Sequence, residues 1–310
     1  MTDTPLFEYK DVHVRYRIGS SIIHALQGIN IKGYAGKTLG VVGESGCGKS
    51  TLAKALLGLV SYQEGEVLFE GKPETPSSAI QMVFQDPDAS LNPRMSVFNH
   101  LKEALLAHQK LSPQEVKARI EELFHMVQIP LQFAEKYPYQ LSGGQKQRIS
   151  IARALSIMPK LIVCDEPLAS LDVSISAQMI QLFKRLQTER NLAYLFITHD
   201  LASLSSLAHT VAVLYLGNLL ELAPCDALYT KPLHPYTQGL LSSVLTPDPE
   251  KEKRRDRIVI AGELPSIVSP PSGCPFHTRC PLATDLCKKE RPVMQEKAPG
   301  HFVACHFISG

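Results

Sequence analysis

The sequence has no uninterrupted apolar run of the roughly 18 residues that a membrane-spanning helix needs. Its most apolar stretch, VAVLYLGNLLELA, is broken by Gly217, Asn218 and Glu221. The amino-terminal residues MTDTPLFEYK contain no apolar core of the length found in a signal peptide. We therefore expect any role at a membrane to depend on a partner protein that spans it.

A strong net charge, internal repeats, low-complexity tracts and sustained heptads are also missing. The formal net charge is only +2 over 310 residues, whereas a nucleic-acid-binding protein usually presents a strongly basic face. We therefore predict no nucleic-acid partner. With 44% hydrophobic and 20% charged residues, the composition is typical of a globular protein with one large domain, or one domain plus a smaller appendage.

Three short apolar runs are each followed at once by a polar or glycine-rich turn, which is typical of buried parallel strands. They are TLGVV at 38–42, LIVC at 161–164 and YLFI at 194–197. The first run leads into a helix-like stretch from Ser50 to Leu59. Strands that alternate with helices predict an α/β fold with ligand sites at the carboxyl ends of the strands.

A helical segment interrupts this alternation. Ser112 and Glu115 have the spacing of a capping box, and Pro113 suits the first position of a helix. Apolar residues then recur at helical spacing. We predict a helical subdomain at about residues 86–158, inserted in the α/β core.

Prolines cluster from Pro224 to Pro249, and the charged run KEKRRDR follows at 251–257. We interpret this region as a solvated linker, with a phosphate-binding basic patch as the alternative. The sequence thus divides into a large domain, residues 1–230, and a small loop-rich module, residues 231–310.

The segment GESGCGKST at 43–51 fits the pattern GxxxxGK[ST] between a predicted strand and a predicted helix. Glycines let the backbone N–H groups of such a loop point inward at phosphates, and the helix N-terminus adds the positive end of its dipole. Lys49 is expected to reach the β- and γ-phosphates, and the Ser50 hydroxyl to bind Mg²⁺. A flexible glycine turn is the alternative. The predicted nucleotide-binding residues of the loop are Gly43, Glu44, Ser45, Gly46, Cys47, Gly48, Lys49, Ser50 and Thr51.

A second predicted strand ends in two acids, Asp165 and Glu166. Carboxylates directly after a buried strand are costly unless a cation or water meets them. Without the phosphate loop, such a pair would indicate a surface turn. Beside that loop, we expect Asp165 to orient Mg²⁺ and Glu166 to polarise the attacking water.

The segment LSGGQ at 141–145 opens a basic helix. Ser142 and Gln145 fit a capping box. This leaves Gly143 and Gly144 unexplained, because glycine weakens a helix start unless the backbone must approach something closely. Backbone N–H groups at a bare helix N-terminus can bind phosphate, so the segment is a second candidate phosphate site.

The phosphate loop, LSGGQ and DEPLASLD at 165–172, in this order, resemble the ATP-binding domain of ABC transporters. The resemblance implies a P-loop ABC ATPase core that forms a head-to-tail dimer. ATP is then held between the phosphate loop of one subunit and the Ser142, Gly143, Gly144 and Gln145 of the other. It also implies Mg²⁺ at Ser50, Gln85 and Asp165, and catalysis by Glu166, His199, Gln85 and Lys49.

Single positions match the same family. Tyr16 resembles the aromatic residue that stacks on adenine, with an ordinary strand tyrosine as the alternative. Gln85, which ends MVFQ, resembles the glutamine that senses Mg²⁺ and the γ-phosphate. His199 follows YLFIT and resembles the switch histidine, and Asp172 resembles the aspartate that communicates across the dimer.

Longer segments narrow the resemblance to ATPase subunits of dipeptide and oligopeptide importers. They are FQDPDASLNPRMSV at 84–97, HPYTQGLL at 234–241 and GELPSIVSPPSGCPFHTRC at 262–280. The resemblance implies a peripheral subunit at the cytoplasmic face of a bacterial inner membrane. Its implied partners are a second, unlike ATPase, two transmembrane permeases and, indirectly, a periplasmic or extracellular peptide-binding protein. The sequence leaves the transported peptide open.

Two other functions are weighed against import. A soluble ABC ATPase that acts on DNA or the ribosome typically has long coiled coils or two cassettes, and this sequence has neither. A regulatory subunit with a dead site conflicts with the intact Lys49, Asp165, Glu166 and His199.

Four of the seven cysteines crowd the carboxyl-terminal region: Cys274, Cys280, Cys287 and Cys305. Four thiolates in a small module suit Zn²⁺ or an iron–sulfur cluster, and their spacing does not choose between them. Four free thiols are the third alternative. The resemblance implies a [4Fe–4S] cluster, which we expect to hold the module together.

Overall fold

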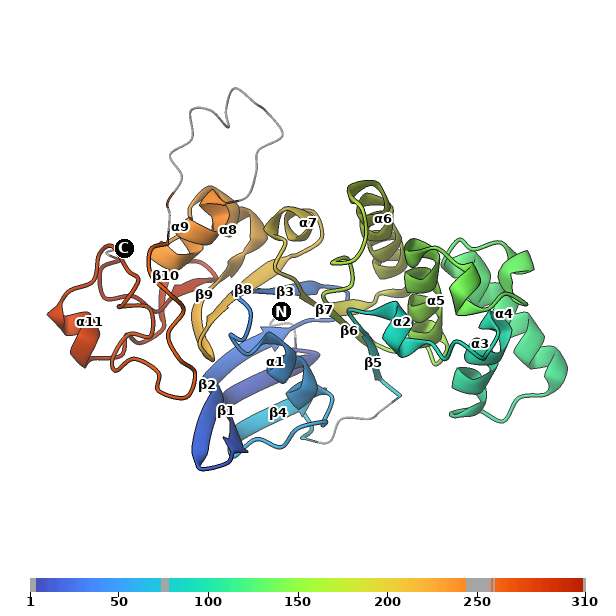
Figure 1. Cartoon of the computed structure of the whole chain (residues 1–310), viewed down its shortest axis with the longest axis horizontal. Coiled ribbons are helices and arrows are strands. Elements are labelled where there is room, and N and C mark those ends of the chain that lie inside the picture. Colours follow the sequence, from blue (N-terminus) through green and yellow to red (C-terminus); the bar gives the residue numbers. More distant parts are fainter. Residues whose placement is uncertain (1–3, 74–77, 244–257, 259, 309–310) are drawn as a thin grey trace, which may run out of the picture.

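The computed structural model describes residues 4–73, 78–243, 258 and 260–308, so the charged run at 251–257 lies outside the described residues. The described residues build two β-sheets (Figure 1). The smaller sheet contains β2 (Ser21–Gly33), β1 (Phe7–Ile18) and β4 (Glu64–Phe69), in that order. The larger sheet has the order β10 (Gln295–Ala298), β11 (His301–Val303), β9 (Asn218–Pro224), β8 (Thr210–Tyr215), β3 (Thr38–Val42), β7 (Ala193–Ile197), β6 (Leu161–Asp165) and β5 (Ile80–Val83).

The centre of the larger sheet is parallel, as the short apolar runs predicted. Neighbouring strands pair in parallel along the order β8, β3, β7, β6 and β5. The three strands predicted from apolar runs are β3, β6 and β7, and the helix expected after the first of them is α1 (Lys49–Leu56). The predicted α/β fold is therefore confirmed.

The central strands are buried on both faces, so successive residues enter two different hydrophobic clusters. On β3, Val41 packs with side chains of the smaller sheet and α1, whereas Val42 packs with side chains of the surrounding helices. On β7, Leu195 packs in the same cluster as Val41, and Phe196 packs in the same cluster as Val42. This two-sided burial explains why the strands lack the alternation of polar and apolar residues that marks a half-exposed strand.

The chain between β5 and β6 is mainly helical. It forms α2 (Pro87–Ser90), α3 (Val97–Leu106), α4 (Pro113–Met126), two short 3₁₀ helices (Leu131–Phe133 and Pro138–Gln140) and α5 (Gly143–Leu155). The capping box before α4 is confirmed, because the Ser112 hydroxyl accepts from the backbone N–H of Glu115 and the Glu115 carboxylate accepts from that of Ser112.

The remaining helices are α6 (Val173–Arg190), α7 (Leu201–Ser205), α8 (Cys225–Thr230), α9 (Pro235–Ser242) and α11 (Asp285–Lys289). Within the described ranges, none of the helices combines the length and the apolar character that a membrane crossing requires.

The carboxyl-terminal segment, residues 260–308, packs on the main body at the end opposite α3 and α4 (Figure 1). Its strand β11 extends the larger sheet, with Phe302 opposite Leu222 of β9. Phe276 is only 1% exposed, and its ring centroid lies 5.3 Å from the centroids of both Tyr215 and Tyr236. The segment therefore shares the core of the larger domain.

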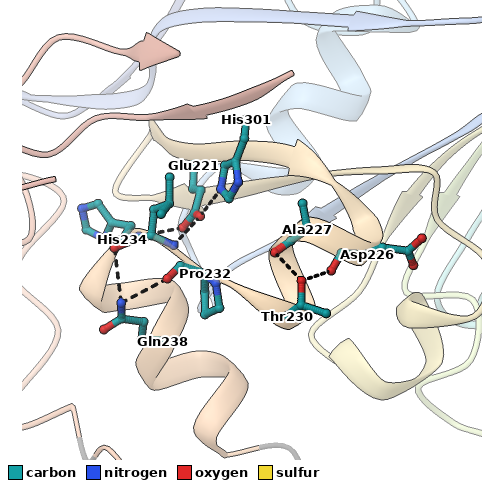
Figure 2. A network of polar contacts seen from close by, with 9 residues as sticks. Glu221, Asp226, Ala227, Thr230, Pro232, His234, Gln238 and His301 are labelled. Atoms are coloured by element: carbon teal, nitrogen blue, oxygen red, sulfur yellow. Dashed lines mark hydrogen bonds and ion pairs between the residues drawn. The ribbon is translucent and has the colours of Figure 1, made fainter. Parts of the chain in front are cut away.

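A buried carboxylate fixes this segment to β9 (Figure 2). Glu221, which interrupts the most apolar stretch of the sequence, is fully buried. Its carboxylate accepts hydrogen bonds from the backbone N–H groups of Leu233 (2.7 Å) and His234 (2.9 Å), and its Oε1 lies 2.7 Å from His301 Nε2. These contacts satisfy a group that would otherwise be costly to bury, and they fix the place where α9 begins.

The aromatic contact of Phe276 gives a test of this shared core. Phe276→Ala should lower the free energy of unfolding by about 3–5 kcal/mol, because it opens a cavity among large buried side chains. Phe307→Ala is the matched control, since Phe307 lies in the same segment but is 42% exposed, and it should change stability by less than about 0.5 kcal/mol. Urea unfolding followed by circular dichroism measures both. Equal effects of the two substitutions would show that the segment does not share the core.

His234 makes stability depend on pH. Burial lowers the pKa of this imidazole from its ordinary value of 6.5 to about 3, and its Nδ1 accepts from the backbone N–H of Tyr236. Between these two values the unfolded chain binds the proton and the folded chain does not, so stability falls as pH falls below 6.5. The slope is up to about 1.4 kcal/mol per pH unit.

His234→Asn isolates this contribution. Asparagine can accept the same backbone hydrogen bond but does not titrate. Between pH 7 and pH 5, the wild type should lose about 2 kcal/mol more stability than the variant. Urea unfolding at both pH values gives the comparison, and parallel losses in the two proteins would contradict a neutral His234.

Candidate functional site

The phosphate loop between β3 and α1 has a backbone that only glycine can adopt at two of its positions. Gly43 has a φ of 152° and Gly48 a φ of 109°. A Cβ atom at Gly43 would lie 2.2 Å from the carbonyl oxygen of Leu214, and one at Gly48 would lie 2.5 Å from that of Ala25. The loop is therefore folded tightly against the neighbouring backbone, which brings its own N–H groups to the start of α1.

Lys49 extends across this loop. Its side-chain Nζ donates to the carbonyl oxygens of Gly43 (2.8 Å) and Glu44 (3.0 Å), and the residue is only 7% exposed. The third donor of the ammonium lies 3.9 Å from the sulfur of Cys47, which is only a weak acceptor and can give way to an anion. The loop thus presents a buried positive charge.

The acids at the end of β6 lie beside the loop. The Ser50 hydroxyl lies beside the Asp165 carboxylate. Burial raises the pKa of Asp165, whereas the Ser50 hydroxyl and the charge of Lys49 lower it. This hydroxyl–carboxylate pair supplies oxygen atoms of the kind that Mg²⁺ prefers in proteins.

Glu166 follows in a left-handed conformation, with a φ of 48°. Its Oε2 lies 3.2 Å from Nδ1 of His199, and its backbone N–H donates to the carbonyl oxygen of Ile197. Backbone strain at a non-glycine residue is common where a side chain must be held at a functional site. The pair can hold a water molecule and accept a proton from it.

A cavity of about 370 Å³ brings nine of the predicted site residues together, and Asp165 is not among them. Those that line it are Tyr16, Ser45, Gly46, Gly48, Lys49, Ser50, Thr51, Gln85 and Glu166. Gly43, Glu44 and Cys47 belong to the loop but do not line this cavity, and His199 lines a second cavity of about 750 Å³ beside α6 and α7. The side chains present fit a magnesium nucleotide, because a buried ammonium and oxygen-bearing side chains line the same cavity.

The sequence reasoning missed other walls of this cavity. They are Ile18, Ile23, His24, Ala25 and Leu216, together with Ile267 of the carboxyl-terminal segment. Ile18 and Ile23 lie close to Tyr16 in the hairpin of β1 and β2, so a strand prediction there could have found them. Ile267 lies within the segment GELPSIVSPPSGCPFHTRC, but no local pattern connects it with the phosphate loop.

LSGGQ lies away from this cavity. The predicted capping box is confirmed, since the Ser142 hydroxyl accepts from the backbone N–H of Gln145 and the Gln145 side chain accepts from that of Ser142. A Cβ at Gly144 would lie 2.6 Å from Cγ2 of Ile175, so a close approach to α6 explains this glycine. No comparable contact explains Gly143. Asp172 accepts from the backbone N–H of Ile175 and caps α6.

The predicted metal centre of the four cysteines is wrong. Among the residues that the structure describes, no group of three or more His, Cys, Asp or Glu side chains is placed to hold a metal ion. Burial raises the pKa of the Cys274 thiol to about 11, and it also raises those of Cys280 and Cys305, with neighbouring thiols adding to the shift.

The reason for the error is physical. A metal was expected because this segment is rich in proline and poor in apolar periodicity, so that it could hardly build a core of its own. The structure shows that it needs none, because Cys274, Cys287 and Phe276 pack in the hydrophobic core of the larger domain. Neither a [4Fe–4S] cluster nor Zn²⁺ is supported.

Comparison with known proteins identifies the family. The sequence matches the model of the ABC transporter family at residues 26–169 and that of the oligopeptide/dipeptide transporter C-terminal region at residues 220–287. The oligopeptide transport ATP-binding protein AppF of Bacillus subtilis is 46% identical, over 98% of this chain and 98% of its own length. The chain belongs to the oligopeptide/dipeptide family of ABC-transporter ATPases.

Further similarities agree with this assignment. The oligopeptide transport ATP-binding protein OppF of Escherichia coli is 47% identical, over 96% of this ABC ATPase and 92% of its own length. The solved structure of cbiO1 from Clostridium perfringens, part of the ABC transporter complex cbiONQ, has a TM-score of 0.67 and 27% identity, over 74% of this chain and 92% of its own. The ATP-binding cassette MJ0796, solved as a dimer with ADP and phosphate, has a TM-score of 0.64 and 28% identity, over 71% and 98% of the two chains.

The family assignment confirms the predicted ABC ATPase fold and the predicted hydrolysis of ATP. None of the similarities supports action on DNA or ribosomes.

Proposed function

We propose that this ABC ATPase powers the import of dipeptides or oligopeptides across a bacterial inner membrane. The observation that carries the proposal is the match of residues 220–287 to the C-terminal region of oligopeptide and dipeptide transporters. The names of relatives that align over nearly the whole chain agree with it. In this proposal the ATPase binds two transmembrane permeases from the cytoplasmic face, and a peptide-binding protein acts on the other side.

Residues 1–230 would form the nucleotide-binding domain, and residues 231–310 the small carboxyl-terminal module. The helical subdomain at 86–158 would contact the permeases. In support, Tyr139 is 71% exposed and stacks on Tyr137, with ring centroids 5.8 Å apart. Exposed aromatic side chains of this kind are typical of protein-binding surfaces.

A second ATPase subunit would complete the nucleotide site. Among the described residues that line the cavity beside Lys49, none comes from LSGGQ. The N-terminus of α5 is therefore free to face the phosphate loop of another subunit, in the head-to-tail arrangement that the sequence predicted. In support, the similar cassette MJ0796 was solved as a dimer. We propose that the partner is a related but unlike ATPase.

In this site Lys49 and the loop N–H groups would bind the β- and γ-phosphates, and Tyr16 would stack on the base. Ser50, Asp165 and Gln85 would hold Mg²⁺, which neutralises phosphate charge when bound. Glu166 would orient the attacking water and accept its proton, and His199, 3.2 Å away, would hold the Glu166 carboxylate in place.

Glu166→Gln tests the catalytic step. The amide keeps the size of the carboxylate but cannot accept the proton, so the ATP turnover of the assembled transporter should fall by at least about 10²-fold while MgATP binding is kept. Lys49→Ala should weaken binding itself. Glu189→Gln, an exposed position near the end of α6, is the matched control and should match the wild type. Steady-state hydrolysis and nucleotide affinity are measured, and near-normal turnover of the Glu166 variant would exclude it as the base.

Transport is tested with the permeases that copurify with the tagged chain from detergent extracts. The assembled transporter in lipid vesicles should hydrolyse ATP at least about tenfold faster than the isolated chain, because the isolated chain lacks the second half of each site. It should also accumulate labelled dipeptides or pentapeptides in an ATP-dependent way. A high rate in the isolated chain that the permeases do not change would contradict this function, and the preferred peptide length would identify the cargo class.

A further inference from the structure

Residues 231–310 contact Glu44 of the phosphate loop in two ways, through Tyr236 of α9 and through Arg279 of the carboxyl-terminal segment. The backbone N–H of Glu44 donates to the hydroxyl of Tyr236 at 2.9 Å. Its carboxylate Oε2 lies 2.7 Å from Nη1 of Arg279. Glu44 and Arg279 are 235 positions apart in the sequence, so the contact is a product of the fold alone.

The arginine is well placed to hold this carboxylate. The Arg279 side chain is only 9% exposed, and that of Glu44 is 26% exposed. The same Nη1 lies 3.4 Å from the Tyr215 hydroxyl, and the guanidinium lies 5.9 Å from the centre of the Tyr215 ring. Water screens such a pair less than it screens an exposed one, so the removal of either charge leaves the other poorly compensated.

Glu44 is also linked to the lysine that lines the nucleotide cavity. Its carbonyl oxygen accepts one of the two hydrogen bonds that hold the Lys49 ammonium, at 3.0 Å. A shift of this peptide therefore moves the charge that meets the phosphates. An uncompensated Glu44 carboxylate would in addition repel a triphosphate.

Tyr236 is held in place by the buried carboxylate of β9. Glu221 accepts from the backbone N–H of His234, and His234 in turn caps the start of α9 by accepting from the backbone N–H of Tyr236 (Figure 2 shows the first of these contacts). Ile267 adds a wall to the cavity that Lys49 lines. Three separate positions of residues 231–310 thus contact the phosphate loop or its cavity: Tyr236, Ile267 and Arg279.

We infer that Arg279 and Tyr236 are positioning residues, which hold the phosphate loop in its nucleotide-binding shape and compensate the charge of Glu44. The inference rests on the proposed role of the loop in binding MgATP. It assigns the carboxyl-terminal segment a part in nucleotide affinity, in addition to any contact it makes with other subunits.

Arg279→Met in the full chain tests the inference. The variant should bind MgATP about tenfold more weakly than the wild type. Arg279→Lys keeps the charge and should lose less than about threefold. Arg291→Met is the matched control, because Arg291 lies in the same segment but pairs with Gln27, and it should bind as the wild type does. Calorimetric titration with MgATP and MgADP gives the affinities.

The readout that separates positioning from general destabilisation is the dependence on phosphate charge. Arg279→Met should weaken MgATP more than MgADP, and the loss should shrink at high salt. In the double variant Glu44→Gln, Arg279→Met, the increase in the logarithm of the Kd for MgATP should be at most about half of that in Arg279→Met, since no carboxylate is then left uncompensated. This double variant also serves as the test if Arg279→Met fails to fold.

Two outcomes overturn the inference: wild-type affinity in Arg279→Met, or equal losses for MgATP and MgADP with no recovery in the double variant. Both leave the proposed function intact, because the wild type still binds MgATP. If the wild-type chain itself does not bind MgATP, the proposed function fails first.

Discussion

A lysine ammonium is buried in the phosphate loop, and the surrounding structure has to accommodate it. Lys49 is 7% exposed, and its Nζ contacts two carbonyl oxygens of its own loop. Carbonyl dipoles compensate a full charge only in part, so the group retains a strong affinity for an anion. For both carbonyls to face it, the chain must turn sharply at Gly43, where a side chain would collide with the backbone of Leu214.

A loop of this composition has few side chains of its own to hold it rigid, so its shape depends on neighbours. The backbone N–H of Gly217 donates to the carbonyl oxygen of Cys47, and the Cys47 side chain is 2% exposed in the core. The Tyr236 hydroxyl and the Arg279 guanidinium hold the loop near its start, at Glu44. Groups that are already in position before the substrate arrives stabilise developing charge without a cost of reorganisation, which is why a rigid loop favours phosphoryl transfer.

Local patterns predicted the parts of the molecule whose contacts are local. The strands β3, β6 and β7 are buried on both faces, so a short apolar run was sufficient to identify them. The capping boxes at Ser112 and Ser142 involve residues three positions apart, and the phosphate loop is a continuous segment. In each case the residues that determine the structure are neighbours in the sequence.

The contacts that the sequence did not reveal connect distant segments. The antiparallel sheet of β1, β2 and β4, the pairing of β11 with β9, and the pair Glu44–Arg279 depend on where folding brings separate segments. The error about the cysteines has the same origin. The composition of the carboxyl-terminal segment does not show that Phe276 obtains its packing from outside the segment, from Tyr215 of β8 and Tyr236 of α9.

The geometry of the site also limits how nucleotide binding can do work. Lys49, Ser50 and Glu166 line a cavity to which, within the described part of the chain, LSGGQ contributes nothing. A nucleotide on one chain alone would therefore keep part of its charge toward solvent, where water screens it. In the proposed dimer the N-terminus of a second α5 covers that side, and its N–H donors gain strength as water leaves. Such closure moves one subunit against the other only if the phosphate loop keeps its shape. The contacts at Glu44 resist a displacement of the loop, and they do so from the side away from the nucleotide.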